Sequence, residues 1–464
     1  MKKILYLFFT LVIALSLCVL TFTSCDGFPP SDQTSGNSSS SDSTSQGDTE
    51  KPTDPVEAVG LKYSVNTDKK TCTVTGIGKC KDENIIISEY IDGYRVTAIG
   101  ANAFKNCDKL IFVALPNSVE VIGKSAFESC DKLKEVTLPD SLLTIEKYAF
   151  ENCISLLHIR LPDSLETVGA CAFKGCASIT EITVPSSVKT IGKDIFYKAN
   201  SLSTVYYNSS YGESGNDFLN TKSIKKIVFG GEIIPEFICK KCENLTDVVI
   251  EDTVKAIGGG AFFLCTSLRE ISVPNSVLSI GYGAFSFCES LIDVTLPDGL
   301  TAISDSTFQS CSSLLNITIP DTVKSIGIEA FLGCSALSAV KLPSNLTHLD
   351  IGAFRDCSAL TDITIPEGIT EISDETFKNC SSLTSIILPE KLEAIGNWAF
   401  SYAGLKTVYF GGTKEEWTAV KKALGWNNGM RDFEIICETD DDENGKVPGS
   451  GDSGETGETV ENQT

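Results

Sequence analysis

AFESCDKLKEVTLPDSLLTIEKY, residues 126–148, is one unit of the repeat that decides the fold of this chain. Its opening motif, Ala-Phe-x-x-Cys-x-x-Leu, returns every 23 residues along much of the sequence. The motif begins at Ala103, Ala126, Ala149, Ala172, Ala261, Ala284, Ala330 and Ala353. Thr307 and Thr376 replace the alanine in otherwise matching copies, and Ile195 replaces it in a copy that also lacks the cysteine. A fixed period of this length is typical of a solenoid, in which each unit stacks on its neighbours and the chain presents a long surface. The repeat therefore favours a binding protein over an enzyme.

Each unit contains the signals of a short strand followed by a tight return of the chain. Val136 and Leu138 alternate with polar residues, as in a strand, and Pro139 ends that strand because it has no N–H to donate. Leu142 and Ile145 have the spacing of one helical turn. Several units then carry a glycine, which suits a positive φ, at Gly123, Gly169, Gly192 and Gly281. The sequence predicts an α/β solenoid of 23-residue coils, with a parallel sheet on one face and short helical or 3-10 segments and turns on the other.

The ends of the chain differ from the repeats in composition. A basic start at Met1-Lys2-Lys3 and an apolar run to Leu20 are typical of an export signal, and the Ser24-Cys25 junction resembles a bacterial lipobox. We expect a lipoprotein signal peptide at 1–24, a lipidated Cys25 with a flexible tether at 25–57, and an acidic disordered tail at 438–464. The alternative at the first junction is simple secretion, with Cys25 incidental. Between these arms we expect an N-terminal cap at 58–100, the solenoid at 101–405 and a C-terminal cap at 406–437.

The net charge of −23 is unevenly distributed, because the acidic tether and tail leave only −11 for residues 58–437. No basic residues cluster along the sequence, so nucleic acid and anionic lipid are poor candidate partners.

The middle of the solenoid, residues 199–242, departs from the regular spacing. The strand positions Leu202, Ile224 and Leu245 are 22 and 21 residues apart, and Ala199 replaces the expected cysteine. Two interpretations stay open for the loop at 206–220. Either it is a tolerated irregularity, or it presents Tyr206, Tyr207 and Tyr211 to a ligand.

The full consensus, Cys-x-x-Leu-x-x-Ile-x-Leu-Pro-x-x-Leu-x-x-Ile-Gly-x-x-Ala-Phe, resembles the BspA-like (Treponema pallidum-type) leucine-rich repeats of bacterial surface proteins. The resemblance covers residues 58–437 and includes a lead-in at 60–96 and a closing segment at 410–417. It implies an adhesin or a host- or matrix-binding protein, although a shared fold does not determine the ligand.

The repeats place eleven of the 18 cysteines in one register: Cys107, Cys130, Cys153, Cys176, Cys242, Cys265, Cys288, Cys311, Cys334, Cys357 and Cys380. Equivalent side chains on stacked coils lie about 4.8 Å apart, whereas the Cβ atoms of a disulfide prefer about 3.8 Å. We therefore expect a buried column of free thiols that serves the structure. Cys72 and Cys80 lie outside this register, and for them both pairing and free thiols stay open.

The sequence offers no convincing catalytic or metal site. Cys239-x-x-Cys242 has no second pair to complete a zinc site, and the only histidines, His158 and His348, lie far apart in the sequence. We expect no catalytic residues, no metal and no cofactor.

The exposed side of the parallel sheet is the candidate ligand face. There, the residues that flank each buried strand residue form columns whose members vary from coil to coil. The candidates are Glu135, Thr137, His158, Arg160, Glu181, Thr183, Tyr206, Asp293 and Thr295. The plain alternative is a solvated β-surface, since Thr favours strands and acids keep a surface soluble.

The sequence as a whole predicts a non-enzymatic lipoprotein, anchored in the bacterial cell envelope and exposed at the cell surface. Its predicted partner is a host, matrix or neighbouring-cell protein, its membrane contact is the N-terminal lipid alone, and it binds no nucleic acid. One alternative is a glycan-binding component of a nutrient-capture system, which would use the aromatic side chains of Tyr206, Tyr207, Tyr409 and Trp417. Another is a structural spacer of the envelope.

Overall fold

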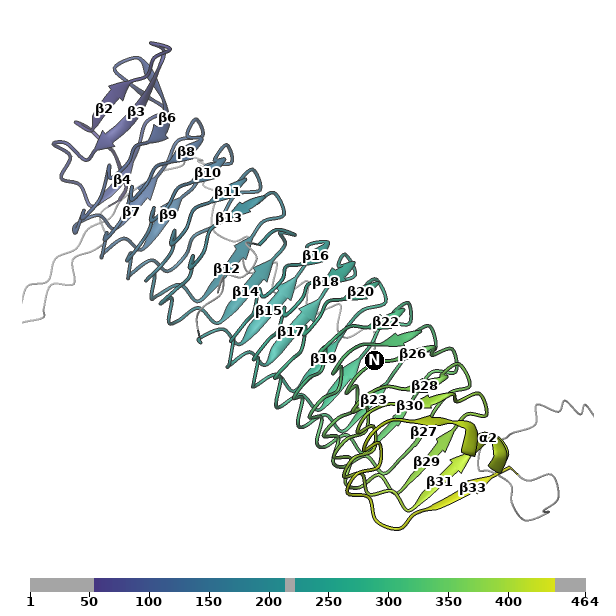
Figure 1. Ribbon diagram of the computed structural model, residues 1–464. Coiled ribbons are helices and arrows are strands. Elements are labelled where there is room, and N and C mark those ends of the chain that lie inside the picture. The colour runs from purple at the N-terminus through teal and green to yellow at the C-terminus, as the bar shows by residue number, and fades with distance from the viewer. Residues whose placement is uncertain (1–53, 213–221, 439–464) are drawn as a thin grey trace, which may run out of the picture. The chain divides into compact units, whose positions relative to one another are not determined.

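The computed structural model describes residues 54–212 and 222–438, which belong to one compact unit. These residues form a solenoid of parallel strands, capped by strands at the N-terminal end and by a short helix at the C-terminal end (Figure 1). The predicted signal peptide, Cys25, nearly all of the tether, residues 213–221 and the acidic tail lie outside the described residues.

One side of the solenoid, the strand face, carries a strand from almost every coil. In β9 the buried Val136 lies between the exposed Glu135 and Thr137, because successive side chains of a strand point to opposite sides. Parallel partners are mostly 23 residues apart, while the irregular middle uses steps of 22 and 21 residues, from Thr204 to Lys226 and on to Asp247. The described strands of this face are β1 (Val56–Glu57), β4 (Asn84–Ile86), β7 (Phe112–Ala114), β9 (Glu135–Thr137), β12 (Glu181–Val184), β14 (Thr204–Tyr207), β15 (Lys226–Phe229), β17 (Asp247–Ile250), β19 (Glu270–Ser272), β21 (Asp293–Thr295), β23 (Asn316–Thr318), β25 (Ala339–Lys341), β27 (Asp362–Thr364), β29 (Ser385–Leu388), β31 (Thr407–Phe410) and β33 (Glu434–Cys437).

The opposite side, the rear face, consists of short parallel strands and not of the predicted helical segments (Figure 1). Its strands are β6 (Tyr94–Ile99), β8 (Val121–Ile122), β10 (Thr144–Ile145), β11 (Thr167–Val168), β13 (Thr190–Ile191), β16 (Ile233–Ile234), β18 (Ala256–Ile257), β20 (Ser279–Ile280), β22 (Ala302–Ile303), β24 (Ser325–Ile326), β26 (His348–Leu349), β28 (Glu371–Ile372), β30 (Ala394–Ile395) and β32 (Lys421–Lys422).

The helical prediction for this side was wrong because the backbone bonds to neighbouring coils. Leu142 closes a single turn through its N–H to the Pro139 carbonyl at 3.1 Å. The next bonds run between coils, from the Glu146 N–H to the Ile122 carbonyl at 2.9 Å and from the Gly169 N–H to the Ile145 carbonyl at 2.7 Å. A spacing of three residues describes both a helical turn and a turn followed by a strand, so periodicity alone does not separate them.

The repeated glycine was predicted to adopt a positive φ, and this prediction was also wrong. Gly192 does not have a positive φ, and the left-handed residues of that coil are Asp194 and Lys198, with φ of 56° and 63°. A Cβ at Gly192 would instead lie 2.2 Å from the Ala170 backbone nitrogen in the preceding coil. Glycine at this position therefore permits the close approach of two coils.

Two columns of side chains fill the core between the faces. Phenylalanine rings stack from coil to coil, as in Phe331 and Phe354, whose centroids lie 5.1 Å apart and whose planes differ by 2°. Each ladder thiol from Cys265 onward donates to a backbone carbonyl of the preceding coil, such as Cys288 Sγ to the Phe262 carbonyl at 3.2 Å. Cys72 and Cys80 are both free thiols, and Cys107, the first residue of the ladder, is only partly buried. The thiol thus acts as a small core group that also donates a hydrogen bond to a backbone carbonyl of the turn.

The irregular coils interrupt the phenylalanine column without opening the core. Cys239 occupies the phenylalanine position there, since its N–H donates to the Ala261 carbonyl at 2.9 Å as the phenylalanines of other coils do to theirs. The space is filled from the strand side by Tyr207 and Phe229, with ring centroids 6.2 Å apart, and Phe229 meets Phe262 edge-on at 6.0 Å. A small residue in one position is thus offset by large residues in another.

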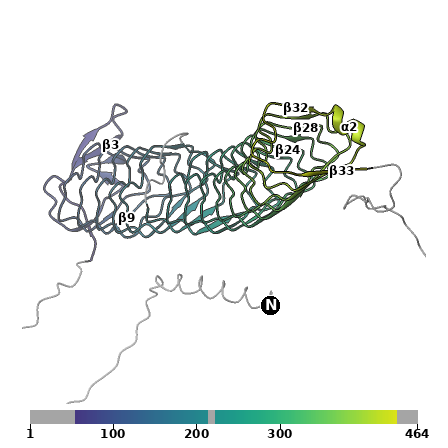
Figure 2. The same ribbon diagram turned by 60° about the horizontal axis from the view of Figure 1, so that its bottom comes forward.

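Both ends of the stack are covered. At the N-terminal end β2 (Lys62–Val65) pairs antiparallel with β3 (Thr71–Gly76), β5 (Tyr90–Ile91) pairs antiparallel with β6, and β3 continues the rear sheet beside β6. At the C-terminal end lies α2 (Lys414–Ala419), the one α-helix of the described residues, near β32 and β33 (Figure 2). Trp417 of α2 packs against Phe410, with ring centroids 5.4 Å apart, and so covers the core of the last coils.

Candidate functional site

The nine residues that the sequence selects as a ligand face all lie exposed on the strand face. They are Glu135, Thr137, His158, Arg160, Glu181, Thr183, Tyr206, Asp293 and Thr295. Each flanks a buried strand residue, so the alternation of the strand positions its side chain toward solvent. The face is therefore a set of aligned positions on a rigid sheet.

The structure divides these nine residues into two groups. Glu135 pairs with His158 across a parallel bridge, and Thr183 pairs with Tyr206 between β12 and β14, so residues 135–206 form one continuous patch. Asp293 and Thr295 lie on β21, and β15, β17 and β19 separate them from that patch. One ligand of small size cannot contact both groups.

The surface around the second group is hollowed and acidic. A hollow of about 290 Å³ lies against Asp293, Thr295 and Asp298, and the adjacent hollow of about 350 Å³ reaches Asp321. A third hollow of about 920 Å³ continues along β23, β25 and β27. The charged residues that line the three hollows are Asp293, Asp298, Asp321, Lys341, Asp362 and Glu367. This acidic trough carries five carboxylates against one lysine.

Three of the trough residues were not predicted from the sequence, although their position after a proline could have identified them. Asp298, Asp321 and Glu367 each follow the proline that ends a strand, at the same place in their coils. The predicted ligand face was limited to positions within the strands. Because the coils stack in register, acids that follow successive prolines line the edge of the strand face together.

The aromatic residues named for the glycan alternative do not gather on one surface. Tyr207 and Trp417 are buried in the core, with 0% and 8% of their surface exposed. Tyr206 lies on the strand face, and Tyr211 emerges beside the rear strands. The interpretation of 206–220 as a loop that presents three tyrosines to one ligand is therefore wrong, because the three side chains lie in three different environments.

The buried cysteine thiols of the core are held in their unreactive, protonated form. Burial raises the pKa of the Cys288, Cys334 and Cys380 thiols to about 12. A protonated thiol is a poor nucleophile and a poor metal ligand. His158 lies on the strand face and His348 on β26 of the rear face, and in the described residues no group of three or more Cys, His, Asp or Glu side chains has an arrangement that could hold a metal ion.

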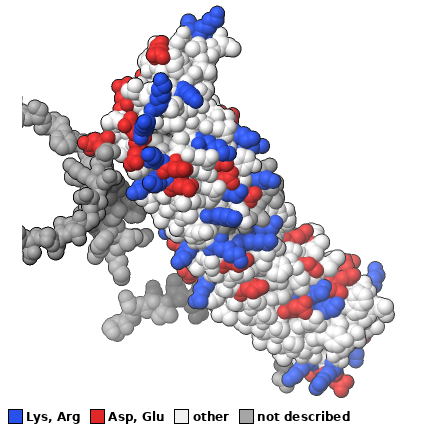
Figure 3. All heavy atoms as spheres, turned by 90° about the vertical axis from the view of Figure 1, so that its left-hand side faces the viewer, with Lys and Arg blue, Asp and Glu red and all other residues white. Residues whose placement is uncertain are grey.

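Charges of both signs are mixed on the surface. Figure 3 shows one side of the molecule, on which basic and acidic side chains are intermixed. None of the helices in the described part of the chain has the length and apolar character needed to cross a membrane.

The repeats match the family model of the BspA type leucine rich repeat region over residues 97–230, 232–327 and 301–419. A leucine-rich repeat protein from Bacteroides ovatus shares 25% sequence identity, with a TM-score of 0.55 and coverage of 81% of this chain and 98% of that chain. The leucine rich repeat protein of T. pallidum shares 27% identity over 50% of this chain and 89% of its own, with a TM-score of 0.34. A leucine rich cell surface protein from Faecalibacterium prausnitzii shares 27% identity over 78% and 96% of the two chains, with a TM-score of 0.35. A search of curated protein sequences gave no match.

Proposed function

Since the chain belongs to the BspA-type leucine-rich repeat family, we propose that it is a non-enzymatic protein-binding module held at the bacterial cell surface by a lipid on Cys25. Its partner is a host, matrix or neighbouring-cell protein that docks on the strand face. The observation that carries the proposal is the acidic trough, where hollowed surface and aligned carboxylates coincide on that face.

The trough suits a partner with a basic surface. Asp293, Asp321 and Glu367 are exposed and their carboxylates form no ion pair with the described residues, so their charges are available to a ligand. Complementary charge speeds encounter and selects among partners. The patch at 135–206, with Glu135, His158 and Arg160 on adjacent strands, is a second candidate contact on the same face.

Binding to a panel of immobilised matrix and host-cell proteins tests the proposal. The variant Asp293→Asn, Asp321→Asn, Glu367→Gln removes three charges from the trough. Loss of the three contacts is expected to weaken binding roughly tenfold, since an exposed charge contact contributes about 0.5 kcal/mol and a tenfold change in affinity is about 1.4 kcal/mol. The variant Glu135→Ala, His158→Ala, Arg160→Ala tests the second patch in the same way.

The matched control is Glu120→Gln, Glu371→Gln, Glu393→Gln, which removes three exposed carboxylates from the rear side of the coils. It is expected to bind like the unmodified protein. Equal affinity of all variants for a partner would exclude the strand face as its binding site.

The location is tested separately. Protease treatment of intact cells is expected to release peptides from residues 58–437, and Cys25→Ala is expected to abolish incorporation of labelled fatty acid. Peptides that appear only after lysis would rule out adhesion and place the protein inside the envelope.

A further inference from the structure

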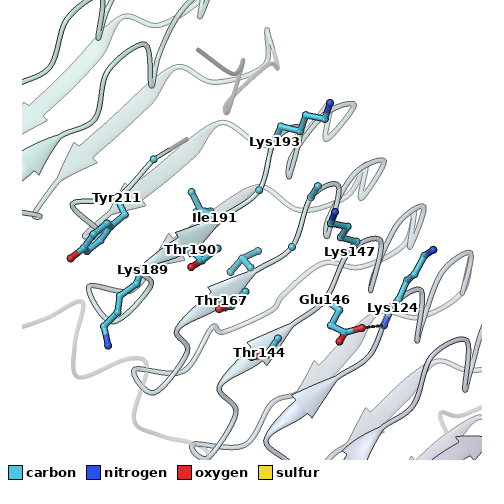
Figure 4. Close-up of a pocket in the computed structure, with 15 residues that line it drawn as sticks. Lys124, Thr144, Glu146, Lys147, Thr167, Lys189, Thr190, Ile191, Lys193 and Tyr211 are labelled. Atoms are coloured by element: carbon cyan, nitrogen blue, oxygen red, sulfur yellow. Dashed lines mark hydrogen bonds between the residues drawn. The ribbon is translucent and has the colours of Figure 1, made fainter. Parts of the chain in front are cut away.

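The rear face carries a further hollow, of about 900 Å³, that is separate from the three hollows of the strand face. It lies over β10, β11 and β13 and ends beside Tyr211 and Gly212 (Figure 4). Thr144, Thr167 and Thr190 follow one another across its floor, one from each strand, and lysine side chains stand along its sides. We call this hollow the rear groove.

Stacking of the coils concentrates lysines at the rear groove. Lys124, Lys147 and Lys193 each occupy the same position of their coils, the second residue after a rear strand. Coils are about 4.8 Å apart, so side chains that are 23 and 46 residues apart in sequence become neighbours along one side. The same position in later coils holds Tyr282, Asp305, Ile328 and Asp374, among others. The expectation that no basic residues cluster was therefore wrong for the folded chain.

Three lysines of the groove form no ion pair with any residue that the structure describes. The groove is lined by Lys124, Lys147, Lys189 and Lys193 and by a single acid, Glu146, whose carboxylate accepts the Lys124 backbone N–H at 2.7 Å. Lys189 is paired with Glu166 at 3.0 Å. The side chains of Lys124, Lys147 and Lys193 are exposed and form no ion pair within the described residues.

Tyr211 is held in place at one end of the groove. Its N–H donates to Ser209 Oγ at 3.0 Å, the buried Ser209 hydroxyl donates to the Val188 carbonyl at 2.7 Å, and the Tyr207 hydroxyl donates to the Tyr211 carbonyl. Tyr211 nevertheless keeps 53% of its surface exposed. Tyr207 and Ser209 of the irregular coils thus fix the Tyr211 backbone, from which an exposed aromatic side chain extends beside the lysines.

We propose that the rear groove binds a linear acidic glycan. Lysine ammonium groups are mobile point charges suited to sulfate or carboxylate groups, and threonine hydroxyls both donate to and accept from sugar hydroxyls. The Tyr211 ring offers an apolar surface with a polar tip, on which the carbon-bound hydrogens of a sugar ring can pack. The lysines, the threonines and the tyrosine thus supply the three kinds of contact that a charged sugar chain needs.

An acidic peptide fits the groove less well. Peptides commonly bind sheets by adding a strand to a free edge. β10 is paired on both sides with β8 and β11, and β11 is paired on both sides with β10 and β13. The outer strand β13 spans only Thr190–Ile191, so an added peptide strand would gain few backbone hydrogen bonds.

The test measures binding of the purified protein to immobilised heparin, a sulfated glycan, and to polygalacturonate, a carboxylated one. The variant Lys124→Ser, Lys147→Ser, Lys193→Ser is expected to weaken binding to at least one of them by roughly tenfold or more, and to flatten its dependence on salt. Tyr211→Ala is expected to weaken binding with the salt dependence unchanged, because the ring carries no charge.

The matched control, Lys324→Ser, Lys391→Ser, Lys406→Ser, removes the same number of exposed lysines outside the groove and is expected to bind normally. The proposal is overturned if neither glycan binds, or if the control loses as much affinity as the groove variant. It is also overturned if poly-glutamate or vesicles of anionic lipid bind as tightly as the glycans with the same lysine dependence, since the groove would then recognise charge alone.

Discussion

The buried thiols are expected to make the protein labile to alkali. Burial raises the pKa of Cys288, Cys334 and Cys380 from the ordinary 9.0 to about 12. Below pH 9 these thiols are protonated in the folded and the unfolded chain, and the stability they contribute is fully present. Between pH 9 and pH 12 the unfolded chain loses the protons first, so the free energy of unfolding falls as the pH rises.

The size of this loss of stability follows from the shift in the thiol pKa. Each thiol lowers the free energy of unfolding by about 1.4 kcal/mol per pH unit over that range, and the three together by about 4 kcal/mol per pH unit. At pH 10.5 the loss is about 6 kcal/mol. This is comparable to the whole stability of a typical domain, about 5–15 kcal/mol.

Urea unfolding followed by circular dichroism at pH 7.5, 9, 10 and 10.5, with a reductant present, measures the loss. The variant Cys288→Ala, Cys334→Ala, Cys380→Ala lowers stability at every pH by leaving small cavities, but this cost does not depend on pH. Lysines and tyrosines titrate in both proteins, so the difference between the two slopes isolates the thiols. Parallel pH profiles for the two proteins would refute the assignment of these cysteines as buried, protonated core groups.

Two further predictions concern the core and the C-terminal end. Phe308→Ala is expected to lower the free energy of unfolding by about 3–5 kcal/mol, because its ring is fully buried and stacks on a ring on either side, with centroids 5.5 and 5.4 Å away. Phe104→Ala loses only one such stack and is expected to lower it less. Equal losses for the two variants in urea unfolding would contradict a role for stacking. Thr413→Ala removes the reciprocal cap between Thr413 and Glu416 and is expected to destabilise α2 by about 1 kcal/mol. The loss would be measured as faster amide hydrogen exchange over residues 414–419. Unchanged exchange there would show that packing alone holds the helix.

Much of the strand face was predictable because every coil repeats the same environment. In each unit one apolar strand residue, such as Val136, must face the core, and this places its neighbours Glu135 and Thr137 in solvent without reference to any distant part of the chain. The cysteine positions were predictable for the same reason, since an exact period puts equivalent side chains above one another. The direction in which the ladder thiols from Cys265 onward donate, to a carbonyl of the preceding coil, was not evident from spacing.

The sequence by itself determined the period, the parallel stacking and the division into buried and exposed strand positions, because these depend on local alternation and on a repeat of fixed length. The tertiary structure decided whether Thr144 and Ile145 form a strand, which depends on the carbonyl of Ile122 in the neighbouring coil. It also decided which charges meet. Lys124 and Lys193 are 69 residues apart in sequence and line one groove, because the coils between them place both on the same side of the stack. Contacts between coils, unlike the pattern within one coil, are absent from any single stretch of sequence.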